Sequence, residues 1–493
     1  MRRSAEKEIK KAERELRNCE TENEESCRKT LSERKKILND YDEKARNKRT
    51  YLNEAKWFRV NEKMSKQWFS LNRPRATNTT IRSLFKTDTE EETTDPEEML
   101  EIAKQHHSQL QKEPIMNRTR ETAIEELLSD ITIELKEKEI EDMEKEITYR
   151  EVNETLRKSP NGKAPGPDGI PNEFWKIEIK WHDKQKKENN QQAGTTGENR
   201  PKTRPCITAM MTKVLQDIEQ HRLADTQFSE ARMSLLYKKK DKRDIQNYRP
   251  ITLLNTDYKI YTKTIANRLR KVTPKLIHKD QAGFMPKRSI YDQTKIVELM
   301  IKWCNNTESK GIIVCLNQEK AYNRIDLNYL WKTLEAFKFS GTFITKVKYL
   351  YKQASTAIRM NGFISNLFDV RRGVRQGNPM SCLLYNLAIE PLIKKIRTST
   401  LRGFNVNPNL NRVLVKVYAD DTTIFLGPED KPETLQDCLN IFCSASTARF
   451  NNLKTEIIPL GSKEDRIEII NSREYNGWKI EEEIHVAQEG EAI

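Results

Sequence analysis

Two adjacent aspartates, Asp420 and Asp421, stand inside the apolar, β-branched run VLVKVYADDTTIFLG. Valine, isoleucine, threonine and aromatic residues favour strands, and Gly427 followed by proline ends the run. The pattern predicts a hairpin of two strands, 413–418 and 422–426, with both acids at its tip. Two interpretations of the pair are open. Aspartate is a common turn residue, and two neighbouring carboxylates, which repel each other, are also a typical site for a hard cation such as Mg²⁺.

The composition limits the class of protein. The 493 residues carry a formal net charge of +14, so a polyanion such as nucleic acid is a reasonable partner. One third of the residues are charged, however, and ordinary solvated surface explains the balance equally well. The eight cysteines form no CxxC pair and show no zinc-ligand spacing, which is typical of reduced thiols. The N-terminus lacks the apolar segment of a secretory signal, and no apolar run is long enough to cross a bilayer. We therefore expect a soluble, intracellular protein.

Local patterns divide the chain into segments. Residues 1–95 are rich in Glu, Lys and Arg at helical spacings, which predicts a charged helical extension that serves as a spacer or as an RNA-binding arm. A second helical zone, 96–160, leads into the Gly- and Pro-rich loop SPNGKAPGPDGIP. Residues 180–204 are polar without periodicity and predict a flexible insertion. Farther on, TDYKIYTKTIANRLRKVTP predicts a helix ended by Pro274. The apolar run at 312–316 predicts a strand buried on both faces.

From about residue 149 to residue 462 the order of motifs resembles the reverse transcriptase domain of non-LTR (LINE-type) retrotransposons. Any one of these motifs alone would be a weak match, but seven stand in the order of that family. They are KAPGPDGIPNEFWK, NYRPITLLNTDYKIYTKTIANRL, QAGFMPKRSIYDQ, LNQEKAYNRID, RRGVRQGNPMSCLLYNLAIEPLI, YADDTTIFL and TARFNNLKTEIIPLG. The segment YLNEAKWFRVNEKMSKQWFSLNRP also resembles the stretch just ahead of that domain.

The resemblance implies an α+β, right-hand polymerase fold with an N-terminal helical extension. Residues 161–310 would be the fingers and residues 311–462 the palm. The thumb is expected to be incomplete, because 463–493 stops without a closing element, where the family continues into a last palm strand and a helical thumb. No endonuclease domain is recognised ahead of the polymerase region. We therefore interpret the chain as a fragment of a larger polyprotein or as a degenerate copy.

The resemblance also implies a chemistry for the aspartate pair. Asp420 and Asp421 would be catalytic, metal-binding acids that hold Mg²⁺ or Mn²⁺. At such a site a two-metal clamp brings a DNA primer 3′-hydroxyl and the α-phosphate of a deoxynucleoside triphosphate together on an RNA template. Positive charge around the triphosphate would come from Lys239, Lys240 and Arg249. We interpret Lys238, in the same basic tip, as solvated surface.

Four further positions correspond to residues of the family. Tyr322 corresponds to the aromatic residue under the sugar, whose bulk disfavours a ribose 2′-hydroxyl, although a core aromatic residue fits this position equally well. Gln376 and Gly377 correspond to the loop that packs against the nascent base pair, where glycine permits close backbone approach. Lys454 corresponds to a lysine that could protonate pyrophosphate, and a surface lysine is an equally good interpretation.

The chain departs from its family at the third metal-binding carboxylate, where Leu-Asp is replaced by Leu-Asn at Asn317. An amide oxygen is a weaker Mg²⁺ ligand than a carboxylate. A missing charge worth about 3–4 kcal/mol lowers the rate by roughly a hundred- to a thousandfold. Asn323 and Asn378 show the same Asp-to-Asn change, and we interpret the three together as decay of a mobile-element copy. Glu319, expected on the following helix, is a conceivable substitute ligand.

The sequence leaves an alternative of a different class. A non-catalytic remnant would hold RNA or an RNA–DNA duplex by backbone charge and shape without extending a primer. Metal-dependent DNA synthesis would support the polymerase, whereas salt-sensitive binding without synthesis would support the non-catalytic remnant. The oligomeric state is open.

Overall fold

The computed structural model describes residues 80–86, 91–177, 179, 207–222, 224–406, 412–488 and 491, with short pieces at 8–9, 11–12, 26, 29–34 and 36. The chain divides into two compact units, Met1–Thr79 and Thr80–Ile493. In the first unit the described pieces are helical, and Arg34 forms an ion pair with Glu8. The rest of the predicted helical extension up to residue 79 and the predicted insertion 180–204 lie outside the described residues.

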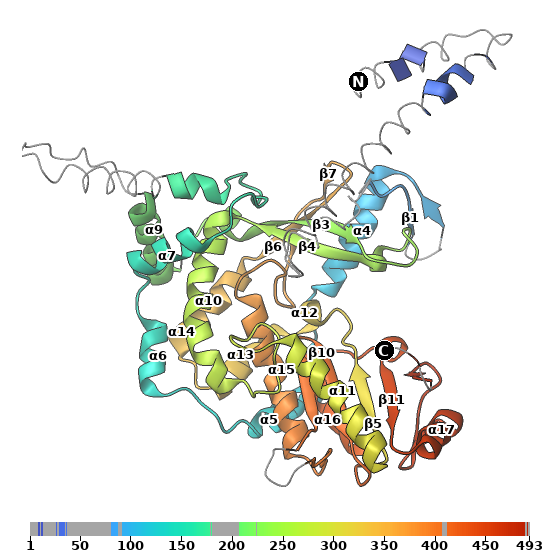
Figure 1. Cartoon of the computed structure of the whole chain (residues 1–493). Helices are drawn as coiled ribbons and strands as arrows, with labels where there is room; N and C mark the ends of the chain where they lie inside the picture. The colour runs from blue at the N-terminus through green and yellow to red at the C-terminus, as the bar shows by residue number, and fades with distance from the viewer. Residues whose placement is uncertain are drawn as a thin grey trace, which may run out of the picture. The chain divides into compact units, whose positions relative to one another are not determined.

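One five-stranded sheet of the second unit carries the two aspartates, and we call it the β5–β10 sheet (Figure 1). Its strand order is β14-β11-β5-β10-β9, and only β14 and β11 pair in parallel. The strands are β5 (Gly311–Leu316), β9 (Val415–Tyr418), β10 (Asp421–Leu426), β11 (Glu456–Leu460) and β14 (His485–Val486). β9 and β10 form the predicted hairpin, although β9 begins two residues later and β10 one residue earlier than the sequence pattern indicated.

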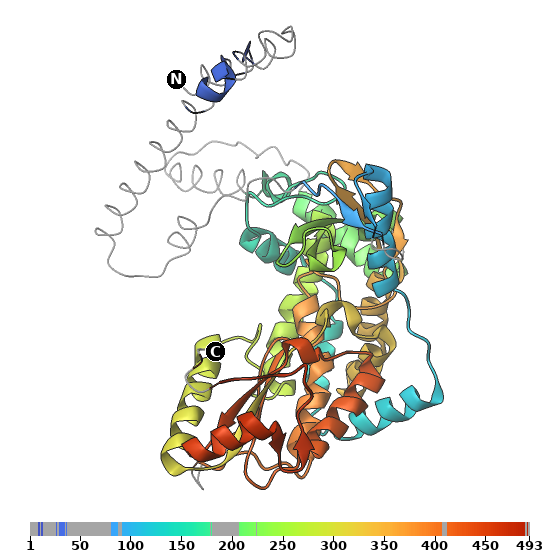
Figure 2. The same cartoon turned by 90° about the vertical axis from the view of Figure 1, so that its right-hand side faces the viewer.

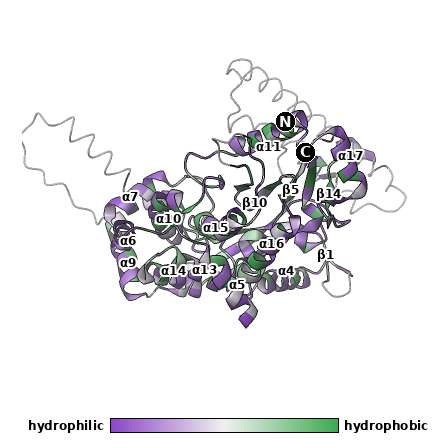
Figure 3. Ribbon diagram, turned by 90° about the horizontal axis from the view of Figure 1, so that it is seen from below, coloured by the Kyte–Doolittle hydropathy of each residue, from purple (hydrophilic) through white to green (hydrophobic). Residues whose placement is uncertain are grey.

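β5 is buried on both faces, as its uninterrupted apolar run predicted. Ile312, Val314 and Leu316 point into the large core that α15 and α16 share, whereas Ile313 points into a smaller core with Met300 of α11. These helices are α11 (Ile290–Thr307), α15 (Ser381–Thr398) and α16 (Pro432–Ser446). Figure 2 shows α11 on one side of the sheet and the other two helices on its opposite side. The hydropathy colouring of Figure 3 is greenest in these strands, and purple predominates on the outer helices.

A second five-stranded sheet, the β3–β4 sheet, has the order β4-β3-β6-β7, with β8 also paired to β6. β3 runs antiparallel to β4 and parallel to β6. The strands are β3 (Glu230–Tyr237), β4 (Tyr248–Leu254), β6 (Ser355–Met360), β7 (Phe363–Ile364) and β8 (Phe368–Asp369). Because β3 and β6 are far apart in sequence, the β3–β4 sheet joins the predicted segments 161–310 and 311–462.

The other described helices follow the predicted zones, with one correction. The zone 96–160 is helical as predicted, in four pieces. α10 was predicted to end at Pro274 but continues to Leu276, because a proline in the last turn removes only one helical hydrogen bond and Leu276 is buried. In the part of the chain that the structure describes, no helix combines the length and apolarity needed to cross a membrane. The helices are α4 (Pro96–Leu110), α5 (Arg118–Ser129), α6 (Glu137–Glu144), α7 (Tyr149–Lys158), α9 (Ile207–His221), α10 (Thr256–Leu276), α12 (Ala321–Arg324), α13 (Leu327–Ala336) and α14 (Gly341–Lys352).

Two predictions about the ends of the second unit are wrong. Within the predicted helical extension, β1 (Leu84–Phe85) and β2 (Glu92–Thr93) form an antiparallel pair, and Leu84 packs with α4 and the β3–β4 sheet. The last segment does contain closing elements: α17 (Lys463–Ser472), the pair β12 (Glu474–Tyr475) and β13 (Trp478–Lys479), and β14, which extends the β5–β10 sheet. Strands of two residues are too short to leave a periodic pattern, so the sequence does not reveal them.

A buried ion pair connects α5 to the start of α13. The Arg120 guanidinium donates to the Asp326 carboxylate at 2.8 Å and to the Ile115 carbonyl at 2.9 Å. Asp326 also accepts the backbone N–H of Tyr329 at 3.0 Å and so caps α13. Both charged side chains are almost completely buried. The pair therefore fixes the helical layer against which the β5–β10 sheet packs.

We expect Arg120→Met to lower the free energy of unfolding by about 3–5 kcal/mol, because Asp326 would remain as a buried charge without its partner. Chemical denaturation at pH 7 measures the change. Arg118→Met, at an exposed position two residues earlier on the opposite face of α5, is the matched control and should stay within about 0.5 kcal/mol of the wild type. Equal effects of the two substitutions would contradict this interpretation of the ion pair.

Candidate active site

The two aspartates lie at and beside a two-residue turn. Ala419 and Asp420 connect β9 to β10, and Asp421 opens β10 opposite Tyr418. Ala419 has φ of +60°, in the left-handed region. A positive φ at the first residue of a two-residue hairpin turn is a conformation in which glycine is usual. An alanine there is strained, so its surroundings must hold it in place.

The electrostatic surroundings disfavour charge on both carboxyls. Burial raises the pKa of Asp420, the neighbouring Asp421 raises it further, and Lys238 and Arg249 oppose the shift. Desolvation likewise raises the pKa of Asp421, and Lys238 opposes it. Neither carboxylate forms a salt bridge with any residue that the structure describes. Two adjacent acids with raised pKa values and no directly bonded cation have the character of a ligand pair for an added cation.

Asn317 stands at the position of the expected third ligand. It follows β5 directly, and its carbonyl accepts the N–H of Asn451 at 2.8 Å. Leu316 pairs with Thr422 across the antiparallel ladder, so the next residue, Asn317, comes level with Asp421. Among the described residues, no group of three or more His, Cys, Asp or Glu side chains is arranged to hold a metal ion. The donors expected from the sequence would therefore be two carboxylates and one amide, which are hard oxygen donors but carry one negative charge fewer than three acids would.

Lys238 is the cation whose charge acts on both acids. It follows the end of β3, and its backbone N–H donates to the Asn247 carbonyl at 3.0 Å. Burial lowers its pKa, as do Arg249, Lys454 and Lys239 in decreasing order, whereas Asp420 raises it. Lys238 was interpreted from the sequence as solvated surface, and its side chain is exposed, but its charge also acts on both acids.

The structure gives the other residues of the basic tip different surroundings. Lys240 has φ of +73°, and its carbonyl accepts the Tyr237 hydroxyl, so its backbone belongs to the turn after β3. Arg249 lies on β4 opposite Leu236 and is exposed. Lys238 could have been found from its place directly after an apolar strand, because the end of a strand is held more rigidly than the tip of its loop.

Tyr322 lies beside the acids as one member of an aromatic pair. Its ring stacks on Tyr385 with centroids 4.6 Å apart. Burial raises the pKa of the Tyr322 hydroxyl, and Cys382 and Asp420 contribute in the same direction. The Tyr385 hydroxyl in turn donates to Gln318 Oε1 at 2.7 Å. Tyr322 is therefore packed as a core aromatic residue and also lies near the acid pair. Neither Tyr385 nor Gln318 was predicted from the sequence, because a tyrosine on an apolar helix carries no local signal.

Gln376 and Gly377 lie in the loop before α15. This loop passes over β4. Gly377 has φ of +96°, and a Cβ there would lie 2.4 Å from the Thr252 carbonyl oxygen. Glycine is therefore required by the close approach of the chain to its own β4. Arg375 fastens the same loop, donating to the carbonyl of Ser229 at 2.6 Å. Gln376 is half-buried beside them.

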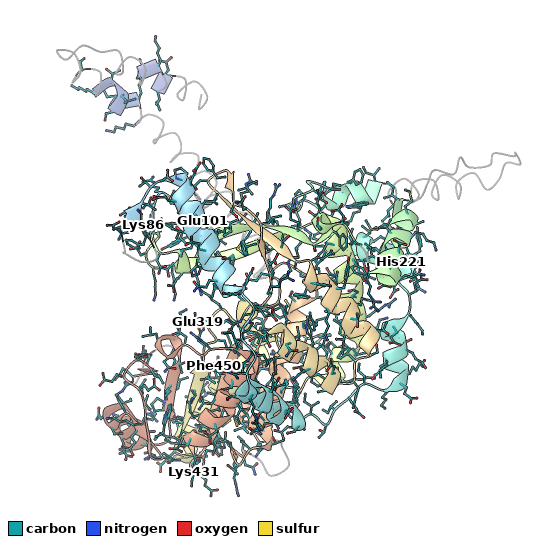
Figure 4. The ribbon with its side chains drawn as sticks, turned by 180° about the vertical axis from the view of Figure 1, so that it is seen from behind. Lys86, Glu101, His221, Glu319, Lys431 and Phe450 are labelled. Atoms are coloured by element: carbon teal, nitrogen blue, oxygen red, sulfur yellow. The ribbon has the colours of Figure 1, made fainter. Side chains whose placement is uncertain are left out.

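Lys454 and Glu319 complete the set of candidate residues. Lys454 ends the 3-10 turn Asn452–Lys454 and is exposed, and its charge lowers the pKa of Lys238. Glu319 was expected on a helix, but it lies in the turn before α12, where its N–H donates to the Arg449 carbonyl. Figure 4 shows Glu319 close to Phe450, which follows that arginine.

The Glu319 carboxylate already has a partner. It accepts the Arg324 guanidinium at 2.8 Å. Burial acts to raise the pKa of Glu319, but the bond and charge of Arg324 outweigh it and lower the pKa below its ordinary value. Serving as a substitute metal ligand would require Glu319 to give up this ion pair.

Comparisons with known proteins agree with the motif order. The family described as "Reverse transcriptase (RNA-dependent DNA polymerase)" matches residues 237–474. The "Transposon TX1 uncharacterized 149 kDa protein" of Xenopus laevis is 33% identical over 340 residues, which cover 69% of this chain and 24% of that protein. The "Retrovirus-related Pol polyprotein from type-2 retrotransposable element R2DM" of Drosophila melanogaster is 26% identical over 182 residues, covering 36% of this chain and 16% of that protein.

A third relative is of the same kind. The "RNA-directed DNA polymerase from mobile element jockey" of Drosophila melanogaster is 26% identical over 187 residues, covering 37% of this chain and 19% of that protein. The chain thus matches about a quarter or less of the length of these relatives. The matched region includes both aspartates, the basic tip and the β5–β10 ladder. Residues 237–474 therefore form a reverse transcriptase domain of the kind carried by non-LTR, LINE-type retrotransposons.

Proposed function

We propose that the acid pair catalyses RNA-templated DNA synthesis, in which a primer 3′-hydroxyl attacks the α-phosphate of a deoxynucleoside triphosphate and pyrophosphate leaves. The observation that carries the proposal is the pair Asp420 and Asp421, which has raised pKa values, no salt bridge to a described residue, and the charge of Lys238 acting on it. The partners would be an RNA template, a DNA primer and deoxynucleoside triphosphates.

We extend the proposal to the architecture of a right-hand polymerase. The β5–β10 sheet with α15 and α16 would be the palm, and the β3–β4 sheet with its basic tip would be the fingers. The parallel pairing of β3 with β6 supports this division, because it attaches the strand before Lys238 to the strand that leads toward Gln376 and Gly377. The charged N-terminal residues would be an extension that precedes this hand in the sequence.

The carboxylates of Asp420 and Asp421 and the amide oxygen of Asn317 fit hard divalent cations, for which we propose Mg²⁺ or Mn²⁺. When bound, two such ions supply a lowered pKa of the attacking hydroxyl and charge stabilisation of the departing pyrophosphate. The donor set is weakest at Asn317, because an uncharged oxygen attracts a divalent cation less strongly than a carboxylate does. The protein therefore presents two strong ligands and one weak ligand.

The chain's own cations would orient the triphosphate. The charges of Arg249 and Lys454 lower the pKa of Lys238, so the three cations lie close together. Their positive charge would be concentrated in one region near the acids. An anion bound among them would relieve this mutual repulsion. Lys239 and Lys240 would add charge from the tip, and Lys454 could donate a proton to pyrophosphate. The ring of Tyr322 would lie under the sugar, and Gln376 with Gly377 would lie against the nascent pair.

A second candidate is favoured by one observation, the uncharged side chain of Asn317 beside only two acids. If the site cannot retain its cations, the domain would bind RNA or an RNA–DNA duplex without extending a primer. Such binding depends on phosphate contacts and weakens steeply with salt. The same cations and the same loops would serve this function.

We expect Asn317→Asp to raise the rate of primer extension on an RNA template by roughly a hundred- to a thousandfold, because it restores a charged ligand to the site. The assay compares the full chain and this variant with Mg²⁺ and with Mn²⁺. The double variant Asn317→Asp/Asp420→Asn is the control and should be inactive. Extension by the wild type at the same rate as the variant would refute our interpretation of Asn317.

Absence of extension by both proteins, together with salt-sensitive binding to an RNA–DNA duplex, would favour the second candidate. A duplex-binding titration at two salt concentrations, run beside the extension assay, makes this decision.

We expect Asp420→Asn to be more stable than the wild type at pH 7. The raised pKa means that the folded protein binds this proton more tightly than the unfolded chain does, so the free energy of unfolding falls as pH rises through the carboxyl range. The asparagine side chain does not titrate, so the variant does not lose this stability. The difference in free energy of unfolding between the variant and the wild type should shrink as the pH is lowered toward the ordinary pKa of an aspartate. Chemical denaturation between about pH 3.5 and pH 7.5 follows the difference, because the ordinary pKa of an aspartate is about 3.9.

Asp241→Asn is the matched contrast for this experiment. The hydrogen bonds from Arg243 lower the pKa of the Asp241 carboxyl, so its ionised form is favoured in the folded protein. The substitution should therefore decrease stability at pH 7, and the deficit should shrink at acid pH. Changes of the same sign in both variants would show that the pKa shift of Asp420 does not govern its effect on stability.

A further inference from the structure

The strained turn residue Ala419 is held by one buried side chain. Its backbone N–H donates to Gln281 Oε1 at 2.9 Å, and its carbonyl accepts Gln281 Nε2 at 3.1 Å. Gln281 is completely buried. A primary amide is suited to this contact, because it carries an acceptor and a donor side by side and so satisfies both groups of one peptide residue.

The segment that carries Gln281 is itself fixed against β9. The N–H of Ala282 donates to the Val417 carbonyl at 2.8 Å, and the N–H of Val417 donates to the Asp280 carbonyl at 3.0 Å. Gln281 Oε1 also accepts the N–H of Gly283 at 2.8 Å, which sets the direction of the amide. These bonds fix the plane of the Gln281 side-chain amide independently of its contact with Ala419.

Buried charges hold the base of this segment. The Asp280 carboxylate is bonded by Arg397 at 2.6 Å and by Lys416 of β9 at 2.5 Å. Arg288 donates to the backbone carbonyl of Gln281 at 2.6 Å. The segment that carries Gln281 is thus fixed to β9 and to α15. A movement of the turn at Ala419 would therefore break its bonds to Gln281.

Gly283 permits the close approach. A Cβ on Gly283 would lie 2.3 Å from the backbone nitrogen of Ala419 and 2.8 Å from its Cα. No side chain fits between the two segments, so the QAGF stretch contacts the turn backbone directly. The carbonyl of Gly283 accepts the buried Asn386 amide at 2.7 Å, which closes the packing from α15.

We propose that Gln281 is a positioning residue, whose amide holds Ala419 in the left-handed conformation and thereby sets the direction in which Asp420 and Asp421 project. The contact is independent of any ligand, while its consequence for the acids rests on the proposed function. Without the amide, Ala419 would relax toward an ordinary φ, and the two carboxylates that follow it would turn with the backbone.

Native-state amide hydrogen exchange of the full chain tests the contact itself. In the wild type the N–H of Ala419 should be protected, because its acceptor is a buried side chain. In Gln281→Met, which keeps the length and removes both polar atoms, we expect exchange of the Ala419 amide to be roughly tenfold faster or more, with the amides of β5 unchanged. Gln281→Glu retains an acceptor and should preserve most of the protection.

Either of two results would overturn the proposal. One is an unprotected Ala419 amide in the wild type, which needs no variant and therefore holds even if Gln281→Met fails to fold. The other is equal protection in the wild type and in Gln281→Met. Gln216→Met is the matched control, since it removes a bond from a half-buried glutamine of α9 to the Ile147 carbonyl and should leave Ala419 unchanged.

Mn²⁺ binding tests the consequence for the acids. In the Asn317→Asp background, we expect Gln281→Met to weaken Mn²⁺ binding, measured by electron paramagnetic resonance of the free ion, at least tenfold, and Gln216→Met to leave it unchanged. Unchanged Mn²⁺ affinity in Gln281→Met would overturn the positioning role even if Ala419 loses its protection. Failure of the proposed function would be visible separately, as absence of primer extension in Asn317→Asp itself.

Discussion

The arrangement of the site depends on burial of β5 between two strands and between two layers of helices. Its backbone pairs with β10 on one side and β11 on the other, and its side chains alternate between two apolar cores. A slip of one residue in this register would exchange Ile313 with its neighbours and drive each set of side chains into the wrong core. The register therefore fixes Asn317, at the end of β5, level with Asp421 at the start of β10. The geometry of the acid pair follows from packing some distance away from it.

The charges near this part of the β5–β10 sheet oppose one another. Burial and mutual repulsion disfavour ionised Asp420 and Asp421, and Lys238 relieves only part of that penalty. A third carboxylate at 317 would add to the repulsion in the folded protein when no cation is bound. At the proposed cation site, the asparagine would thus make the ligand-free domain easier to fold and the cation harder to bind. This opposition between stability and function is common at sites that concentrate like charges.

The two other asparagines interpreted as decay are accommodated by the fold. Asn378 Oδ1 accepts the N–H of Met380 at 2.9 Å at the start of α15, a bond that an aspartate would also make. Asn323 is buried in α12, where Gly373 passes so closely that a Cβ on that glycine would lie 2.7 Å from the Asn323 Cα. Asn323 lies within α12 and Asn378 shortly before α15, and both helices are formed. The structure therefore tolerates these substitutions, and their effect on a copy of the element would lie in chemistry rather than in folding.

The sequence by itself determined the elements whose signal is local. The hairpin that carries Asp420 and Asp421, the doubly buried strand β5, and the helices between residues 96 and 160 were all readable from periodicity and turn residues, and the ordered motifs identified the domain. Other features are contacts between segments far apart in the chain, which no local pattern records. These include the two-residue strand β14, the extension of α10 past Pro274, the charge of Lys238 acting on the acids, and the amide of Gln281 on Ala419. Only the tertiary structure decided them, because a proline, a lysine or a glutamine acquires its role from the segments that fold against it.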